Sequence, residues 1–340
     1  MIEGLDDDLV YSRAQEVAEV RMERPHVVIL GAGASRATCP KGDKNGRPLP
    51  VMADFSRLLG LNDLFHGWGI DPDRNFEDTY SDLFEAGETE KLKQLNERVE
   101  AYFCALELPD SPTVYDYLVL SLRQTDLIAT FNWDPLLLQA YRRHPSRFRR
   151  PKLAFLHGNV LAGYCPTDKV MGWAGLPCDR CGEALSRTPL LYPVRHKNYA
   201  KEGSIAIQWD LLKHEMREAF MFTIFGYGGP KTDQEAIDAM SKAWGSPSER
   251  VLEQTDFITL QPKDEVRNVW NRFIHSHHYE VADDFFESWL AKHPRRTGEA
   301  YLAQYIDAKF VEGNPLPQEV SLEELWNWLD PLQRSEQALG

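Results

Sequence analysis

The sequence has no long apolar segment. Nowhere in its 340 residues is there a run of about 18 uninterrupted apolar residues, which is the length that a membrane-spanning helix requires. The first ten residues are acidic, whereas a secretory signal is basic and then apolar. We therefore expect a soluble protein of the cytoplasm, with no membrane partner.

Cysteine and basic charge are also scarce. Five cysteines in a reducing compartment do not make a disulfide framework. The 38 Lys and Arg residues are outnumbered by 52 Asp and Glu residues, which gives a net charge of −14. Because binding to a phosphate backbone requires a basic surface, we expect no direct contact with nucleic acid. The 43% apolar and 11% aromatic content is typical of a globular protein.

Short apolar segments alternate with helical patterns along most of the chain. This alternation predicts an α/β fold, a Rossmann-like doubly wound sheet of parallel strands. In such folds ligands bind beyond the carboxyl ends of the strands. The predicted strands span residues 27–30, 126–131, 152–156, 220–225 and 256–260.

Two insertions interrupt this pattern. About 95 residues separate the first two strands, far more than one crossover needs, and they predict an inserted helical module at about 52–123. Residues 158–201 are rich in Gly, Pro and Cys, which predicts a small zinc-ribbon-like insertion. Within the first insertion the helical patterns cover residues 52–64, 78–106 and 114–123.

Helical patterns also follow the last predicted strand, at residues 279–291, 301–310 and 322–332. The leucines and tryptophan of the last of these share one helix face, which we expect to pack against the body of the protein; a docking surface for another chain is the alternative. We expect one Rossmann-like domain at residues 25–290 and a helical C-terminal extension at residues 291–340.

A turn of small residues follows the first predicted strand. It consists of Gly31, Ala32, Gly33, Ala34 and Ser35. Small residues let the backbone approach a diphosphate closely, and the amides of such a turn bind phosphate. A plain connection between strand and helix is the alternative. Arg36 occupies the position where the dinucleotide fingerprint G-x-G-x-x-G has its third glycine, which disfavours a hydride-transferring dehydrogenase.

Polar side chains follow the second and third predicted strands. Asn132 and Asp134 come directly after the second strand, and His157 comes after the third. An amide can orient a water molecule or a ribose hydroxyl, and an imidazole is suited to general-base catalysis near neutral pH. We predict Asn132 and His157 as catalytic residues and Asp134 as a ligand-binding residue. The alternatives are a turn in which Asn132 and Asp134 satisfy backbone amides, and a structural histidine.

Glycines also follow the fourth predicted strand. Gly226 and Gly228 come first, and Thr232 and Asp233 then stand at the start of a predicted helix. Their hydroxyl and carboxyl groups are candidates for binding ribose or phosphate oxygens of the ligand. A helix cap is the equally weighted alternative for Asp233.

Four residues of the Cys-rich insertion have the spacing of metal ligands. Cys178 and Cys181 form a C-x-x-C turn, and Cys165 and Asp168 form a C-x-x-D half-site. We predict a structural Zn²⁺ at these four residues. His196 is the alternative fourth ligand, and buried thiols without metal are the alternative to a zinc site.

The order of these motifs resembles the sirtuin fold. G-A-G-x-S, T-F-N-W-D, H-G, a Cys-rich insertion and F-G-x-G follow one another, and the resemblance is greatest to SIR2-like NADases of bacterial antiphage defence. It covers roughly residues 27–289, and Cys165 lies eight residues after His157, as the zinc ribbon of sirtuins follows the catalytic histidine. The resemblance implies that the pocket for NAD is lined by Ala32, Ser35, Asn132, Asp134 and His157.

The resemblance also implies an activity. The chain lacks the G-I-P-D-F-R segment of the deacylases and the extended strand that grips an acyl-lysine peptide. We therefore expect hydrolysis of NAD to nicotinamide and ADP-ribose, with depletion of NAD as the defence. A sirtuin-type deacylase or ADP-ribosyltransferase is one alternative, and a non-catalytic nucleotide-binding subunit is another. A NADase needs control, which implies a homo-oligomer or a regulatory partner such as a HerA-like ATPase or a short Argonaute.

Overall fold

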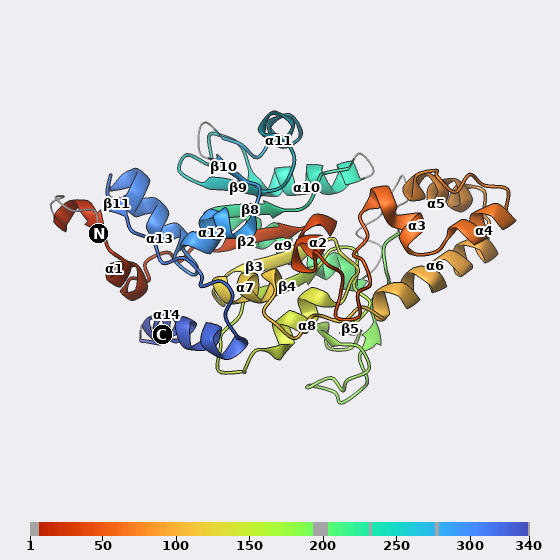
Figure 1. Ribbon diagram of the computed structural model, residues 1–340, viewed down its shortest axis with the longest axis horizontal. Helices are drawn as coiled ribbons and strands as arrows, with labels where there is room; N and C mark the ends of the chain where they lie inside the picture. Colours follow the sequence, from red (N-terminus) through yellow and green to blue (C-terminus); the bar gives the residue numbers. More distant parts are fainter. Residues whose placement is uncertain (1–6, 193–202, 231–232, 276–278, 339–340) are drawn as a thin grey trace.

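A six-stranded parallel sheet forms the centre of the molecule. The computed structural model describes residues 7–192, 203–230, 233–275 and 279–338. The strands lie in the order β10-β9-β8-β2-β3-β4 (Figure 1). Their bounds are β2 His26–Leu30, β3 Leu127–Thr130, β4 Lys152–Phe155, β8 Met221–Phe225, β9 Gln254–Ile258 and β10 Tyr279–Ala282. This is the α/β fold that the sequence predicts.

Helices cover both faces of the sheet. Val28 and Leu30 of β2 point into one core, which holds α2, α7 and α8, whereas Val27 and Ile29 point into the other, which holds α9, α10 and α11. This division follows from the alternation of side chains along a strand. The helices are α2 Ala32–Thr38, α7 Val114–Ser121, α8 Leu136–Arg143, α9 Gly203–Glu218, α10 Gln234–Trp244 and α11 Lys263–Trp270.

All five predicted strands are confirmed, but the sequence interpretation missed the sixth. Residues 279–291 were predicted as one helix and instead form β10, the short 3₁₀ turn η4 Phe285–Glu287 and α12 Trp289–Lys292. The side chains of β10 alternate with the period of two that is typical of a strand. Tyr279 and Val281 pack on the core, while Glu280 faces the other way. The helix predicted over residues 301–310 is confirmed only in its first part: Tyr301 ends α13 and η5 Leu302–Ile306 continues as a π-helix, whereas β11 Phe310–Val311 is extended.

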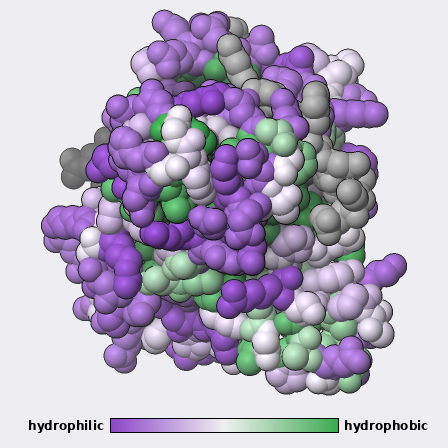
Figure 2. All heavy atoms as spheres, turned by 90° about the vertical axis from the view of Figure 1, so that its right-hand side faces the viewer, coloured by the Kyte–Doolittle hydropathy of each residue, from purple (hydrophilic) through white to green (hydrophobic). Residues whose placement is uncertain are grey.

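The segment between β2 and β3 is helical, as predicted. A break at Gly87, with φ of +70°, divides the long helix predicted over residues 78–106 into two. The elements of this segment before α7 are η2 Met52–Asp54, α3 Phe55–Leu58, α4 Asn62–Gly67, α5 Phe76–Glu85 and α6 Thr89–Cys104. They project at the right of Figure 1, and Figure 2 shows this end of the molecule as largely hydrophilic with scattered apolar areas.

The Cys-rich segment forms a small antiparallel sheet of its own. Its strands are β5 Ala162–Cys165, β6 Val170–Trp173 and β7 Ser186–Arg187, in the order β6-β5-β7. Cys165, Cys178 and Leu185 form a small apolar cluster of their own in this segment. So small an apolar core indicates that the segment needs a further cross-link for stability.

The N-terminal and C-terminal segments pack against each other. The N-terminal segment contains η1 Asp7–Leu9, β1 Val10–Tyr11 and α1 Arg13–Ala18, and the C-terminal one contains α13 Thr297–Tyr301 and α14 Leu322–Gln337. β1 pairs with β11, and α1 contacts α14. Leu325, Leu329 and Leu332 of α14 are buried, which confirms that this helix packs on the body.

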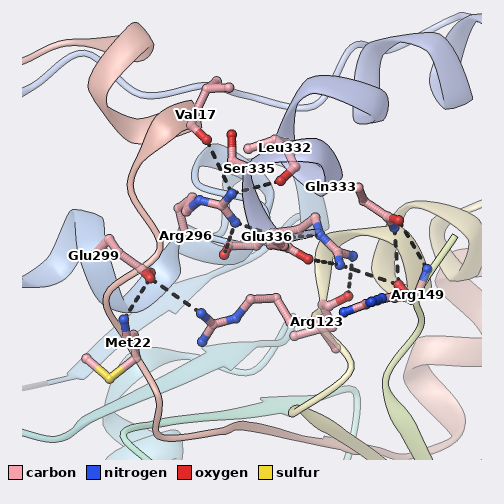
Figure 3. A network of polar contacts seen from close by, with 12 residues as sticks. Val17, Met22, Arg123, Arg149, Arg296, Glu299, Leu332, Gln333, Ser335 and Glu336 are labelled. Atoms are coloured by element: carbon pink, nitrogen blue, oxygen red, sulfur yellow. Dashed lines mark hydrogen bonds and ion pairs between the residues drawn. The ribbon is translucent and has the colours of Figure 1, made fainter. Parts of the chain in front are cut away.

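Two buried arginines connect α14 to the rest of the fold. Arg295 and Arg296 have fully buried side chains and both pair with Glu336. Arg296 also donates to the carbonyls of Val17 and Leu332, as Figure 3 shows. Among the described residues, no helix is long and apolar enough to cross a membrane.

Candidate functional site

The predicted site residues gather at one edge of the sheet. The strand order reverses its direction between β2 and β8, which is the position where doubly wound sheets generally bind their ligands. Gly31 follows β2 and Gly226 follows β8 at this point. Asn132 and Asp134 follow β3, and His157 follows β4, at the same carboxyl edge.

The glycines of the two loops pack directly on each other. A Cβ on Gly31 would lie 2.6 Å from the carbonyl oxygen of Gly226, and one on Gly226 would lie 2.2 Å from the amide nitrogen of Ala34. Gly226 also has φ of +62°, which favours glycine. Both positions therefore exclude any side chain.

The amides of the small-residue turn are already occupied. Gly31 N–H donates to Phe225 O at 3.0 Å, Gly33 N–H to Gly226 O at 2.9 Å, and Ala34 N–H to Gly31 O at 3.0 Å. An N–H group donates one good hydrogen bond, so these three amides are satisfied within the protein in this structure, and phosphate binding by the turn stays a prediction. The glycines serve the close approach of β2 and β8.

Asn132 is held in a network of side chains from three elements. Its Nδ2 donates to Gly31 O at 2.8 Å and to Ser35 Oγ at 2.9 Å, and lies 3.3 Å from the hydroxyl of Tyr115 on α7. Ser35 Oγ in turn donates to Asp134 Oδ2 at 2.6 Å. The network therefore joins the ends of β2 and β3.

The chemistry of the groups fixes the direction of every bond in this network. Ser35 gives its single proton to Asp134, so the hydroxyl of Tyr115, 2.7 Å away, donates to Ser35 Oγ. Burial raises the pKa of Tyr115 well above its ordinary value, which keeps this proton in place. Burial also raises the pKa of Asp134, although the bonds from Ser35 and Leu136 N–H oppose the rise.

This arrangement leaves the other end of the Asn132 amide available. A carbonyl oxygen can only accept, so the bond to Gly31 O requires the NH₂ group on that side and turns Oδ1 away from it. Oδ1 accepts no hydrogen bond from the described residues, and the side chain is half-buried. An oriented acceptor of this kind can position a water molecule or a hydroxyl group.

His157 packs against Phe131, the residue that precedes Asn132 in the chain. The two rings meet edge to face with centroids 4.8 Å apart, and Phe131 also stacks on Tyr227 at 4.3 Å. The imidazole is buried, and its Nε2 lies 4.0 Å from Asp233 Oδ1. The hydroxyl of Tyr227 donates to the other oxygen of Asp233 at 3.0 Å.

Asp233 is therefore oriented toward the imidazole. It stands at the N-cap position of α10, but its side chain makes no capping hydrogen bond. The carboxylate instead accepts the hydroxyl of Tyr227 and faces the imidazole of His157. A Cβ on Gly228 would make only an ordinary contact, with Gln261 Nε2 at 3.9 Å, and Thr232 lies outside the described residues.

The four predicted metal ligands converge. The Sγ atoms of Cys165, Cys178 and Cys181 and a carboxylate oxygen of Asp168 all lie within 4.8 Å of one another. Cys165 Sγ is 3.5 Å from Cys181 Sγ, and Cys178 Sγ is 3.2 Å from Asp168 Oδ2. Tetrahedral zinc with Zn–S bonds of ~2.3 Å places its sulfur ligands about 3.8 Å apart, so the group fits this ion.

Four protein ligands would leave no open coordination position on the metal, which is typical of a structural zinc site. His196 lies outside the described residues.

Three residues of the site were missed by the sequence interpretation. Tyr115 completes the Ser35 network from within the apolar helix α7, where no sequence signal marks it. Asn159 is fully buried and donates to the carbonyl of Asp134; its place two residues after His157 was the available signal. Tyr227 lies between Gly226 and Gly228, the two glycines predicted to bind the ligand.

The solved structures that this chain resembles are Sir2 proteins. A Sir2 homologue in complex with NAD has 15% identity and a TM-score of 0.38 over 84% of this chain and 93% of its own. A structure titled for the mechanism and regulation of Sir2 enzymes has 13% identity and a TM-score of 0.41 over 81% and 93%. Sir2 with a p53 peptide and NAD has 15% identity and a TM-score of 0.39 over 81% and 92%.

No family model matches the chain, and no curated protein matches it either. At these identities and TM-scores the Sir2 structures do not identify the chain, so its function has to be argued from its own side chains.

Proposed function

We propose that this protein hydrolyses NAD⁺ to nicotinamide and ADP-ribose. The observation that carries the proposal is the fixed amide of Asn132, whose Oδ1 accepts no hydrogen bond from the described residues and which lies at the same carboxyl edge of the sheet as the buried imidazole of His157. The motifs shared with SIR2-like NADases indicate the ligand, and the reversal of strand order between β2 and β8 marks the edge where a doubly wound sheet binds it.

The reaction needs few catalytic groups. The bond between C1′ of the ribose and the nicotinamide nitrogen breaks, and its electron pair leaves with the neutral nicotinamide. The remaining ribosyl cation needs oriented dipoles rather than a strong acid, and Oδ1 of Asn132 supplies one. Water attacks C1′ and gives up a proton to the imidazole of His157. The carboxylate of Asp233 stabilises the imidazolium that results.

The experiment measures nicotinamide release from NAD⁺ by the purified full-length chain, with and without an acetylated peptide. We expect release without peptide, lowered about 10²- to 10⁴-fold by His157→Ala and about 10²- to 10³-fold by Asn132→Ala. The matched controls are His214→Ala and Asn268→Ala, at exposed positions of α9 and α11, and they should retain full activity. Turnover that requires the peptide would instead identify a deacylase or transferase. NAD⁺ binding without turnover would identify a nucleotide-binding subunit.

We further propose that the activity serves antiphage defence and is kept in check by another component. An uncontrolled NAD⁺ hydrolase would exhaust the NAD⁺ of its own cell. Self-assembly, a HerA-like ATPase or a short Argonaute are the candidate controls. Cellular NAD⁺ is therefore measured during phage challenge in cells with the wild-type chain, the two site variants and the two controls. A fall in NAD⁺ with the wild type and controls alone supports the proposal, and no fall with any chain, together with no turnover in vitro, overturns it.

A further inference from the structure

A cavity of about 640 Å³ lies at the β9–β10 edge of the sheet. Asp256 of β9 and Glu280 of β10 are paired in register and line it together. Asp283 lines it just beyond the end of β10, and Ser288 and Trp289 of the α12 segment line it as well. The cavity shares no residue with the site at the ends of β2, β3 and β4.

Asp256 is buried with one oxygen unsatisfied. The residue is 4% exposed, and Oδ1 accepts a 2.7 Å hydrogen bond from the amide of Gln254. Oδ2 is buried and accepts no hydrogen bond from any residue that the structure describes. Burying a polar atom without a partner is costly, so such an atom in a cavity wall indicates a ligand that completes its bonds.

The cavity carries an excess of negative charge. Among the described residues, no Lys, Arg or His forms an ion pair with Asp256, Glu280 or Asp283. Lys292 also lines the cavity, but its Nζ pairs with Glu287 at 3.1 Å. Burial, and then the negative charge of Glu280, raise the pKa of Asp256 to about 8. A cation in the cavity would offset both effects.

The shape of the site favours an organic cation over a metal ion. Among the described residues, three or more His, Cys, Asp or Glu ligand atoms converge only at the Cys165 group, so the cavity acids are too dispersed to hold one ion. Its volume is in the range of small-molecule sites. Trp289 adds an indole, the aromatic group that attracts cations most strongly.

We propose that this cavity binds a small aliphatic polyamine. One ammonium group pairs with Asp256 and Glu280, and a second one pairs with Asp283 nearer the surface. The methylene chain between them packs against Trp289. The proposal is independent of the NAD⁺ reaction, because it involves none of the residues of that site.

Calorimetric titration of the full-length chain with spermidine tests the proposal. We expect saturable binding of one spermidine per chain, weakened at least tenfold by Asp256→Asn and by Glu280→Gln. The control Glu235→Gln removes an exposed charge from α10, outside the cavity, and should leave the affinity unchanged. This control separates site binding from general attraction to an acidic protein.

Three outcomes would overturn the proposal. They are the absence of saturable binding, equal affinity of the wild type and a folded Asp256→Asn variant, and equal or tighter binding of magnesium chloride in a parallel titration. Thermal melts of each variant establish that it is folded. Because Asn removes a buried acid that opposes folding, we expect the Asp256→Asn variant to remain folded.

Discussion

The hydroxyl of Ser35 donates a 2.6 Å hydrogen bond to Oδ2 of the buried Asp134, although 99 positions separate the two residues. The same oxygen of Ser35 accepts from Asn132 and Tyr115. One small side chain therefore connects the turn after β2 with the residues after β3.

Ser35→Ala should impair both stability and activity. Asp134 keeps the Leu136 amide but loses its hydroxyl donor, and an unsatisfied buried group costs about 1–3 kcal/mol. Asn132 loses one of its acceptors, and we expect nicotinamide release to fall at least tenfold. Urea unfolding and the release assay measure the two effects.

Ser121→Ala is the matched control, because the side chain of Ser121 is also buried but bonds only to a carbonyl of its own helix. Unchanged turnover in Ser35→Ala would show that the network does not position Asn132.

The carboxyl-edge cluster could be predicted because its signals are local. A strand that ends in small or polar residues marks the edge of a parallel sheet, and this placed Gly31, Asn132 and His157 without any knowledge of tertiary contacts. Tyr115 could not be predicted in this way. It belongs to a continuous apolar helix, and its role arises only when α7 packs against α2.

The sixth strand and the arginine network show a second limit. Four residues of β10 are too few to separate a period of 2 from a period of 3.6 when glutamates and aromatics surround them. Arginine side chains are mostly exposed in proteins, so no local signal marks Arg295 and Arg296 as buried. Their burial depends on Glu336, 41 and 40 residues further along the chain, and on carbonyls such as those of Leu122 and Leu332.

The Cys-rich sheet should contain one zinc ion per chain. Native mass spectrometry should show this mass, and it should disappear in Cys178→Ser. Cys104→Ser, on α6, is the control and should retain the ion. Removal of the metal by a chelator should increase hydrogen exchange in residues 162–187, because little apolar core remains there. A wild-type chain that lacks zinc after purification in zinc-containing buffer would identify the three cysteines as free thiols that bind no metal.

Glu336→Gln should destabilise the protein strongly at neutral pH. The change leaves the fully buried guanidinium groups of Arg295 and Arg296 without their anion, and breaking a buried pair costs about 3–5 kcal/mol. Although burial raises the pKa of Glu336, the bonds and charges of the two arginines hold it below its ordinary value. The stabilisation is therefore present above a pH of about 4.3 and is lost as the pH falls through the lower folded-state pKa.

Urea unfolding of the wild type and Glu336→Gln at pH 7 and at lower pH measures this loss. Glu323→Gln, exposed on the same helix, should change stability by no more than the ~0.3–1 kcal/mol of a helix-end charge. A difference between the wild type and Glu336→Gln that stays constant as the pH falls would contradict the ion-pair account.

Asp256 should make the protein less stable as the pH rises. Its pKa is about 8 in the folded chain against 3.8 for the ordinary carboxyl, so the folded state holds a proton between these values that the unfolded state has lost. Stability falls wherever the folded state binds more protons, and this contribution therefore decreases from a pH of about 4 up to about 8. Asn carries no such proton, so Asp256→Asn should raise the melting temperature more at pH 8 than at pH 5. Glu235→Gln should show no such trend, and an Asp256→Asn effect that is equal at both values would mean that the carboxyl titrates normally in the folded chain.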